Sequence, residues 1–289
     1  EGSRIFYYDE KKNWWSRSGV PKKMPEGEPG GPDTEMFWDF GIDLKLHEHS
    51  QWSKEPCHVN CDCGRFMEIG NNVFMEYLKT STGFEKLPKP NVDFGGGLER
   101  MEAALRNDSD VFNTSLFLKL KEGIEKGSKK KYGENKDEIK AFRIIMDHVR
   151  AAVFLISDGV TPSNTDKGYI LRRLLRRARY YYNVLGAHDQ SLAIFAHFIA
   201  LDYGNADYYG LLKKRDEIAG VITSEETSFI STLMFGQKLL EKIIKEEEKI
   251  SAENAFLLYS TYGYPFELIL DIANEKKVTL DEQGLLEKN

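Results

Sequence analysis

The sequence has no apolar run that approaches the ~20 residues needed to span a membrane. Its first residues, Glu1 to Tyr8, are polar and aromatic, so they do not resemble the apolar core of a secretory signal peptide. Cysteine is scarce: the chain has three, all between Cys57 and Cys63. An odd number of crowded cysteines argues against a disulfide framework and favours a reducing, cytoplasmic compartment.

The chain also lacks an excess of positive charge, because 46 acidic residues outnumber 40 basic ones and the formal net charge is −6. A protein that binds nucleic acid over its whole surface is usually basic throughout, so any contact with RNA must come from a local patch. Two common nucleotide motifs are missing as well. The glycine run Gly95–Gly97 is not followed by Lys-Ser/Thr, as a P-loop requires, and it lacks the G-x-G-x-x-G spacing.

The patterns that are present predict an α+β chain of two domains. A length of 289 residues is sufficient for two domains. Residues 1–107 contain β-prone segments and glycine clusters, whereas residues 108–289 follow helical periodicity. We therefore expect an antiparallel sheet with helices, followed by an all-helical domain. The expected strands are Ile5–Tyr8, Met36–Phe40 and Arg65–Tyr77. The main expected helices are Leu98–Leu105, Asp147–Ser157, Tyr169–Tyr182, Lys213–Ile250, Ala255–Thr261 and Phe266–Lys276.

The segment from Pro88 to Met101 places a carboxylate, bare backbone and a helix start side by side. Glycines at 95–97 allow a ligand to approach the main chain, and a helix N-terminus offers N–H groups to an anion. Arg100 adds a cation suited to phosphate, and Asp93 could hold an ammonium group. The alternative is structural: a tight turn, with Asp93 as a helix cap.

Trp15 precedes a loop rich in proline and glycine, where it could stack on a flat ligand or belong to the core. Asp33 and Glu35 stand where the second expected strand begins, which suits ligand contacts or a structural cap equally well.

Cys57, His58, Cys61 and Cys63 follow the pattern C-H-x-x-C-x-C, which could bind zinc if His47 or His49 contributed. The spacing differs from the usual C-x-x-C pair, so a surface loop with reduced thiols is the alternative.

The expected helix at Tyr169–Tyr182 is apolar on one face and carries four arginines on the other: Arg172, Arg173, Arg176 and Arg177. Arg179 to Tyr182 continue that second face. Few acidic residues are near in sequence, so we favour a nucleic-acid backbone as the partner over acids from other helices. Ser163 and Asn164, just before the helix, could reach base edges in the shallow minor groove of RNA.

Three stretches together resemble alanyl-tRNA synthetase, a class II enzyme, over nearly the whole chain. Pro90 to Arg100 is similar to the P-x-V-D-T-G-M-G-L-E-R of motif 3. Asp147 to Ala152, continuing through Asp158 to Asn164 and Gly168 to Arg177, resembles the most specific signature of the family. Tyr259 to Pro265 resembles L-Y-D-T-Y-G-F-P.

The resemblance implies that alanine is activated with ATP and Mg²⁺ and transferred to the 3′ end of tRNA(Ala), in the cytoplasm and without a membrane. The family's alanine pocket maps to Trp15, Val73, Asp93 and Gly95. The ATP site maps to Gly97 and Arg100. Recognition of a G·U pair in the acceptor stem maps to Asn164 and Ser260, with the arginines on the RNA backbone. Catalysis would rest on positioning and charge stabilisation, without a protein nucleophile.

Besides the substitutions within motif 3, the chain departs from the family pattern at three places. Ser260 replaces an aspartate, Gly70 replaces the tryptophan of E-I-W-N, and the Cys57–Cys63 loop has no counterpart in the pattern. The resemblance also places motifs 1 and 2 before Glu1, and the editing and dimerisation segments after Asn289. We therefore expect a fragment that covers the second half of the catalytic domain and the tRNA-recognition domain. Two alternatives stay open: an RNA-binding module without catalysis, and zinc-dependent chemistry at the cysteines.

Overall fold

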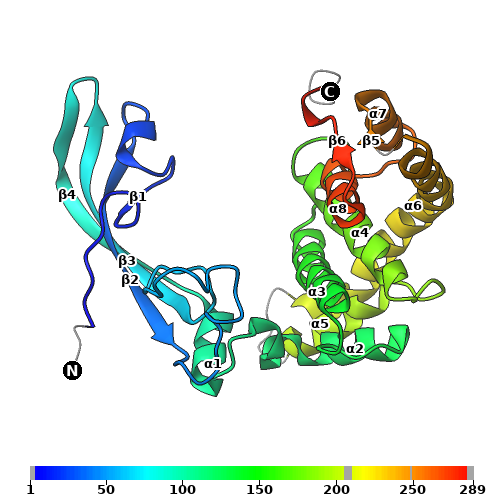
Figure 1. Cartoon of the computed structure of the whole chain (residues 1–289), viewed down its shortest axis with the longest axis horizontal. Helices are drawn as coiled ribbons and strands as arrows, with labels where there is room; N and C mark the ends of the chain where they lie inside the picture. Colours follow the sequence, from blue (N-terminus) through cyan, green and yellow to red (C-terminus); the bar gives the residue numbers. More distant parts are fainter. Residues whose placement is uncertain (1–3, 205–209, 248, 285–289) are drawn as a thin grey trace. The chain divides into compact units, whose positions relative to one another are not determined.

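A computed structural model of the chain describes residues 4–204, 210–247 and 249–284. It divides into two compact units, residues 1–114 and 115–289, drawn in Figure 1. The sequence placed the boundary after Asn107, where helix α1 ends. In the structure the first unit extends to Thr114, because a short 3₁₀ turn, Val111–Asn113, packs against α1.

The first unit is a four-stranded antiparallel sheet in the order β1-β2-β3-β4. Its strands are β1 (Trp14–Ser16), β2 (Pro29–Asp39), β3 (Phe66–Thr80) and β4 (Gly83–Gly96). Strands β3 and β4 form a long hairpin, and helix α1 (Leu98–Arg106) follows β4 directly (Figure 1). The antiparallel sheet and the helices confirm the expected fold class.

An aromatic cluster stabilises one face of this sheet. The Trp14 ring lies 6.0 Å from the Tyr77 ring and 5.5 Å from the Phe84 ring, measured between centroids. Such offset and edge-to-face pairs add to the stabilisation that comes from buried area alone.

The strand expected at Ile5–Tyr8 is wrong. Residues 5–9 are irregular, and Ile5, Phe6 and Tyr7 are exposed. Aromatic and β-branched residues favour a strand only where a partner supplies ladder hydrogen bonds. Here β1 pairs with β2 through residues 14–16, and the Tyr8 N–H donates to the Asn13 side chain.

The second unit is helical, apart from a two-residue parallel bridge between β5 (Lys249–Ile250) and β6 (Thr279–Leu280). Its helices are α2 (Leu118–Ser128), α3 (Lys136–Ser157), α4 (Asp166–Val184), α5 (Ile194–Gly204), α6 (Leu211–Glu247), α7 (Ala252–Ser260) and α8 (Phe266–Lys276). The long helix expected at Lys213–Ile250 therefore ends earlier, and Ile250 belongs to β5 instead.

Helices α3 and α4 pack side by side at the centre of this unit (Figure 1). Helix α3 begins where the Asn135 side chain caps the Asp137 N–H at 2.9 Å, and it ends at Asp158, before Gly159 with φ of +87°. On α4, Leu171, Leu175 and Ala178 are fully buried, as the periodicity predicted. Among the described residues, no helix combines the length and apolar character that crossing a membrane requires.

Candidate functional site

Val73 lies at the centre of the candidate site in the sheet unit. It is paired with Asp33 on β2 and with Asp93 on β4. The next row pairs Asn71 with Glu35 and with Gly95. Residues directly opposite in an antiparallel ladder point to the same face, so these six residues share one face, which we call the site face. Two carboxylates therefore flank an apolar side chain that is 6% exposed.

Two acidic residues of the site face, Asp33 and Glu35, lie close to Glu68 and are partly dehydrated, whereas Asp93 is exposed. Asp33 is 8% exposed, and its Oδ1 atom has no hydrogen-bond partner within the described part of the chain. Burial raises the pKa of Asp33, and the nearby Glu68 carboxylate adds to the rise. Burial, Glu68 and Asp33 likewise raise the pKa of Glu35. A cluster of this kind favours a cationic group such as an ammonium.

Two adjoining cavities open beside these carboxylates. They have volumes of about 380 and 450 Å³ and share the side chains of Glu35, Phe37, Val59 and Asn60. Asp33 lines the first cavity, whereas Glu68 and Arg100 line the second. The Arg100 NH1 group donates to the Glu68 carbonyl at 3.1 Å and lies 3.5 Å from the Glu68 carboxylate. Arg100 is thus held at the cavity, and its side chain is 52% exposed, so a ligand could reach it.

The glycine run is neither a tight turn nor a capped helix start. Gly95 and Gly96 continue β4, and none of the three glycines has a positive φ. Gly97 is the N-cap of α1 and makes no side-chain capping bond, whereas Asp93 lies within β4 and accepts from the Phe94 N–H at 2.9 Å. The alternative of a tight turn with Asp93 as a helix cap is therefore wrong. A Cβ at Gly95 would lie 2.9 Å from the Asn71 Oδ1, so a larger residue here would require the Asn71 side chain to move.

Trp15 is not a core residue, since it is 42% exposed. The core role belongs to its neighbour Trp14, which packs against Tyr77 and Phe84. Trp15 pairs with Gly31, and Gly31 is two residues from Asp33 on the same strand, so Trp15 points to the side of the sheet that carries the site face. It lines a separate cavity with Met75, rather than the two cavities beside Asp33.

The helical unit brings Asn164 and Ser260 together, although 96 positions separate them in sequence. Both line one cavity of about 290 Å³, which we call the helical pocket. Its other lining residues are Tyr169, Arg172, Arg173, Arg176, Tyr259, Gly263, Tyr264 and Pro265. Burial, together with the neighbouring Tyr259, raises the pKa of Tyr169 to about 12, so its hydroxyl stays protonated and can donate.

The four arginines of α4 do have acidic partners, contrary to the expectation from the sequence. Arg172 and Arg176 share Glu225 of α6, at 3.2 and 2.7 Å. Arg173 pairs with Glu267, and Arg177 pairs with Asp271 at 2.8 Å, both acids on α8. The sequence missed these pairs because the acids are 49 or more residues away from their arginines. Four guanidinium groups against three carboxylates leave one positive charge in excess.

Arg179 does not continue the arginine face either. It is 1% exposed, pairs with Glu226 at 3.3 Å and donates to the carbonyls of Gln190, Ala187 and His188. Tyr181 and Tyr182 are buried as well. A signal for this arrangement does exist in the sequence: Glu225 and Glu226 fall on the apolar stripe of α6 between Ile222 and Phe229. Acids at such positions indicate a buried cationic partner.

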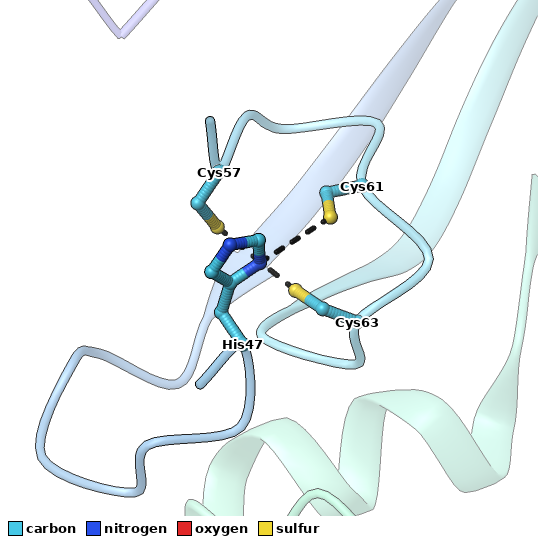
Figure 2. Close-up of side chains that lie close together, drawn as sticks. All are labelled: His47, Cys57, Cys61 and Cys63. Carbon is cyan, nitrogen blue, oxygen red and sulfur yellow. Dashed lines mark hydrogen bonds between the residues drawn. The ribbon is translucent and has the colours of Figure 1, made fainter. Parts of the chain in front are cut away.

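The three cysteines lie together with His47 in the connection between β2 and β3 (Figure 2). Cys61 also lines the larger of the two cavities beside the site face.

The family assignment comes from comparison with known proteins. The whole chain, residues 1–289, matches the family model described as tRNA synthetases class II (A). This chain belongs to the class II tRNA synthetase family. The family expected from the motifs is therefore confirmed.

Individual relatives of this class II synthetase chain are alanine–tRNA ligases. The enzyme of Elusimicrobium minutum (strain Pei191) is 40% identical over 283 residues, covering 97% of this chain and 31% of the relative. The enzyme of Fervidobacterium nodosum is 37% identical, covering 96% of this chain and 33% of the relative. The enzyme of Borrelia hermsii is 36% identical, covering 98% of this chain and 46% of the relative. The chain thus spans a third to a half of the length of these relatives.

The departure of this class II synthetase chain at Gly70 has a steric explanation. A Cβ at Gly70 would lie 3.1 Å from the Phe94 ring, and a Cβ at Gly96 would meet the same ring at 3.1 Å. Phe94 therefore covers both glycines on the face opposite Val73. Where the family pattern has Trp at 70, Thr at 94 and Met at 96, this chain supplies bulk from position 94 alone.

We expect Gly70→Trp and Phe94→Thr to be coupled, because both place or remove bulk in one space. Each change alone should lower the free energy of unfolding, and the double variant should lose about 1 kcal/mol less than the sum. All four native tryptophans lie in the sheet unit, so tryptophan fluorescence during urea unfolding measures this unit. Val92→Thr, an exposed change on the same strand, should show no coupling to Gly70→Trp. If the losses in free energy of unfolding caused by Gly70→Trp and Phe94→Thr simply add up, the two side chains do not occupy the same space.

The buried Asp33 carboxyl makes stability depend on pH. Its folded-state pKa is raised, so the native state holds the proton more tightly than the unfolded chain, and stability falls as pH rises above the ordinary value of about 3.9. Asp33→Asn cannot ionise and should therefore raise the free energy of unfolding at pH 7, on the order of 1 kcal/mol. The gain should vanish below about pH 4. Urea unfolding across this pH range tests it, with the exposed Asp43→Asn as a control that should show no gain. A gain independent of pH would refute the electrostatic cause.

Proposed function

We propose that this chain carries parts of an alanine–tRNA ligase, which activates alanine with ATP and transfers it to the 3′ end of tRNA(Ala). In this proposal, residues 1–107 belong to the second half of the aminoacylation domain and residues 108–289 to the domain that recognises the acceptor stem. The observation that carries it is the row Asp33-Val73-Asp93, which matches the chemistry of a small apolar amino acid. The names of the relatives agree with this choice of substrate.

Alanine would be held by its two distinguishing groups. The ammonium would lie near Asp93, with Asp33 as a second carboxylate on the same face, and the methyl group would contact Val73. The resemblance adds Trp15 as an apolar wall of the pocket, whereas the cavity that Trp15 lines here is the separate one with Met75. Gly95 would allow the ligand to approach β4, because it has no side chain.

ATP would be bound next to alanine, through Arg100 and the N-terminus of α1 at Gly97. A guanidinium and uncapped helix N–H groups both favour phosphate. The carboxylates of Glu35 and Glu68 are the kind of oxygen ligands that suit Mg²⁺, which neutralises phosphate charge when bound. Attack of the alanine carboxylate on the α-phosphate would break the α–β phosphoanhydride bond and release pyrophosphate. This step would depend on the orientation of the two substrates, with no side chain acting as a nucleophile.

The acceptor stem of tRNA(Ala) would bind at the helical pocket. Asn164 and Ser260 would face the minor groove, where G·U and other pairs differ in their donor groups. Arg172, Arg173 and Arg176 line this pocket, and Arg177 continues the same helix face. Their contribution to binding the RNA backbone rests on the excess of one positive charge, not on unpaired side chains.

An RNA-binding module without catalysis is the second candidate function. It is favoured by the helical pocket, whose charged lining residues are all arginines. The two functions differ in one property: only a ligase needs the site face to bind alanine.

Alanine-dependent exchange between ATP and pyrophosphate tests the ligase. With the N-terminal half of the catalytic domain supplied in trans, we expect exchange that Asp93→Ala reduces by at least about a hundredfold, because the ammonium loses its charged partner. Glu85→Ala, an exposed acid on the same strand, should retain activity. Absence of exchange under every reconstitution would favour the RNA-binding module.

Binding of acceptor-stem hairpins tests the second site. The chain should prefer a hairpin with the G·U pair over the same hairpin with G·C, and Asn164→Ala should remove about tenfold of that preference. Affinity should fall as salt rises, since phosphate contacts release counterions. Asn274→Ala, an exposed amide on α8, serves as the matched control. Equal binding of an unrelated hairpin, unaffected by Asn164→Ala, would overturn the assignment.

A further inference from the structure

The long connection between β2 and β3 carries a cluster of four side chains that commonly bind metals. One ligand atom each from His47, Cys57, Cys61 and Cys63 lies within 4.8 Å of the other three (Figure 2). Residues 40–65 contain no helix or strand, and a connection of this length in a compact unit needs support of its own. We propose that these four residues bind one structural zinc ion.

Two distances within the cluster are close to those of a tetrahedral zinc site. The Sγ atoms of Cys57 and Cys63 are 3.9 Å apart, and Cys61 Sγ lies 3.6 Å from His47 Nδ1. Zinc bonds of about 2.3 Å to sulfur and 2.0 Å to nitrogen place neighbouring ligand atoms about 3.5–3.8 Å apart. A disulfide would require about 2.05 Å, and all three cysteines are free. The cluster therefore has the dimensions of a metal site rather than of a cystine.

The orientation of His47 gives an independent argument. Its Nε2 atom lies 2.9 Å from the Glu55 carbonyl oxygen, which can only accept a hydrogen bond. Nε2 must therefore carry the proton, and the lone pair of Nδ1 is directed toward the sulfur atoms. A zinc-bound histidine is usually fixed in this way, by donating its other N–H to a carbonyl or carboxylate. The geometry also chooses between the two histidines left open by the sequence, since the exposed His49 is not in the cluster.

The site is closed, which favours a structural role over catalysis. Three thiolates and one imidazole complete a tetrahedral shell, so no position remains for a reactive water. His47, Cys61 and Cys63 are each 9% exposed. Zinc-dependent chemistry, the third idea raised by the sequence, does not suit four protein ligands.

The zinc would support one wall of the cavity beside the site face. At the base of the connection, Arg65 forms two 2.8 Å bonds to the Asp39 carboxylate, and Phe40 N–H donates to the Arg65 carbonyl at 3.0 Å. The metal would fasten the other end. Between these two points, Val59, Asn60, Asp62 and Gly64 line the cavity that contains Glu68 and Arg100. Loss of the metal should thus loosen this wall without removing any substrate-binding residue.

Metal content of the purified chain tests the proposal directly. Protein prepared without chelators should contain about one zinc per chain by elemental analysis. Cys63→Ser and His47→Ala should lose most of it, whereas His49→Ala and His58→Ala, exposed histidines of the same connection, should retain it. Replacement of zinc by Co²⁺ should give the visible absorption of a tetrahedral thiolate site.

A second measurement on the unaltered chain decides the matter if the variants do not fold. Zinc added to the reduced, metal-free protein should slow the reaction of all three thiols with a disulfide reagent and change the fluorescence of Trp52, which lies within the connection. Failure of the reduced chain to bind zinc, with thiol reactivity unchanged by the metal, would overturn the proposal. Neither readout requires ligase activity, so the zinc site and the proposed function can fail separately.

Discussion

The pairing of β3 with a neighbour on each side is the constraint on which the sheet unit depends. Because β3 is central, its register with β2 and β4 determines which side chains share a face. A slip by one residue would turn Val73 and Asn71 to the side of Phe94 and would separate Asp33 from Asp93. Irregularities in both ladders, between Gly30 and Asp33 and between Met75 and Tyr77, lie beside this row. Trp14, Tyr77 and Phe84 stabilise the register from the opposite face.

The same register determines which side chains lie on each face of the sheet. One face gathers carboxylates around Val73, at a cost in solvation that burial imposes on Asp33. On the other face, Phe94 covers Gly70 and Gly96, where the family pattern distributes bulk over three positions. A ligand with a positive charge would offset the unfavourable crowding of carboxylates on the first face.

In the helical unit, like charges that are crowded on one helix are balanced by ion pairs. Four arginines on one helix face are stabilised by three acids from α6 and α8, which cross α4 from elsewhere in the chain. These pairs hold the guanidinium groups in defined positions around the helical pocket and leave a small positive excess. Preorganised arginines lose less conformational freedom on binding RNA than solvated ones would, which makes paired side chains compatible with recognition.

The sequence by itself determined the family, the fold class and the helices that carry strong apolar periodicity, such as Phe266–Lys276, because these features depend on local pattern. It also supplied Asp93, Asn164 and the cysteines as candidates. Only the tertiary structure decided which of them meet. Strand register joined Asp33 to Asp93, helix packing joined Asn164 to Ser260 and gave the arginines their acids, and the path of the β2–β3 connection selected His47. Each of these contacts links residues far apart in sequence, where no local propensity acts and where only long-range packing fixes the distance.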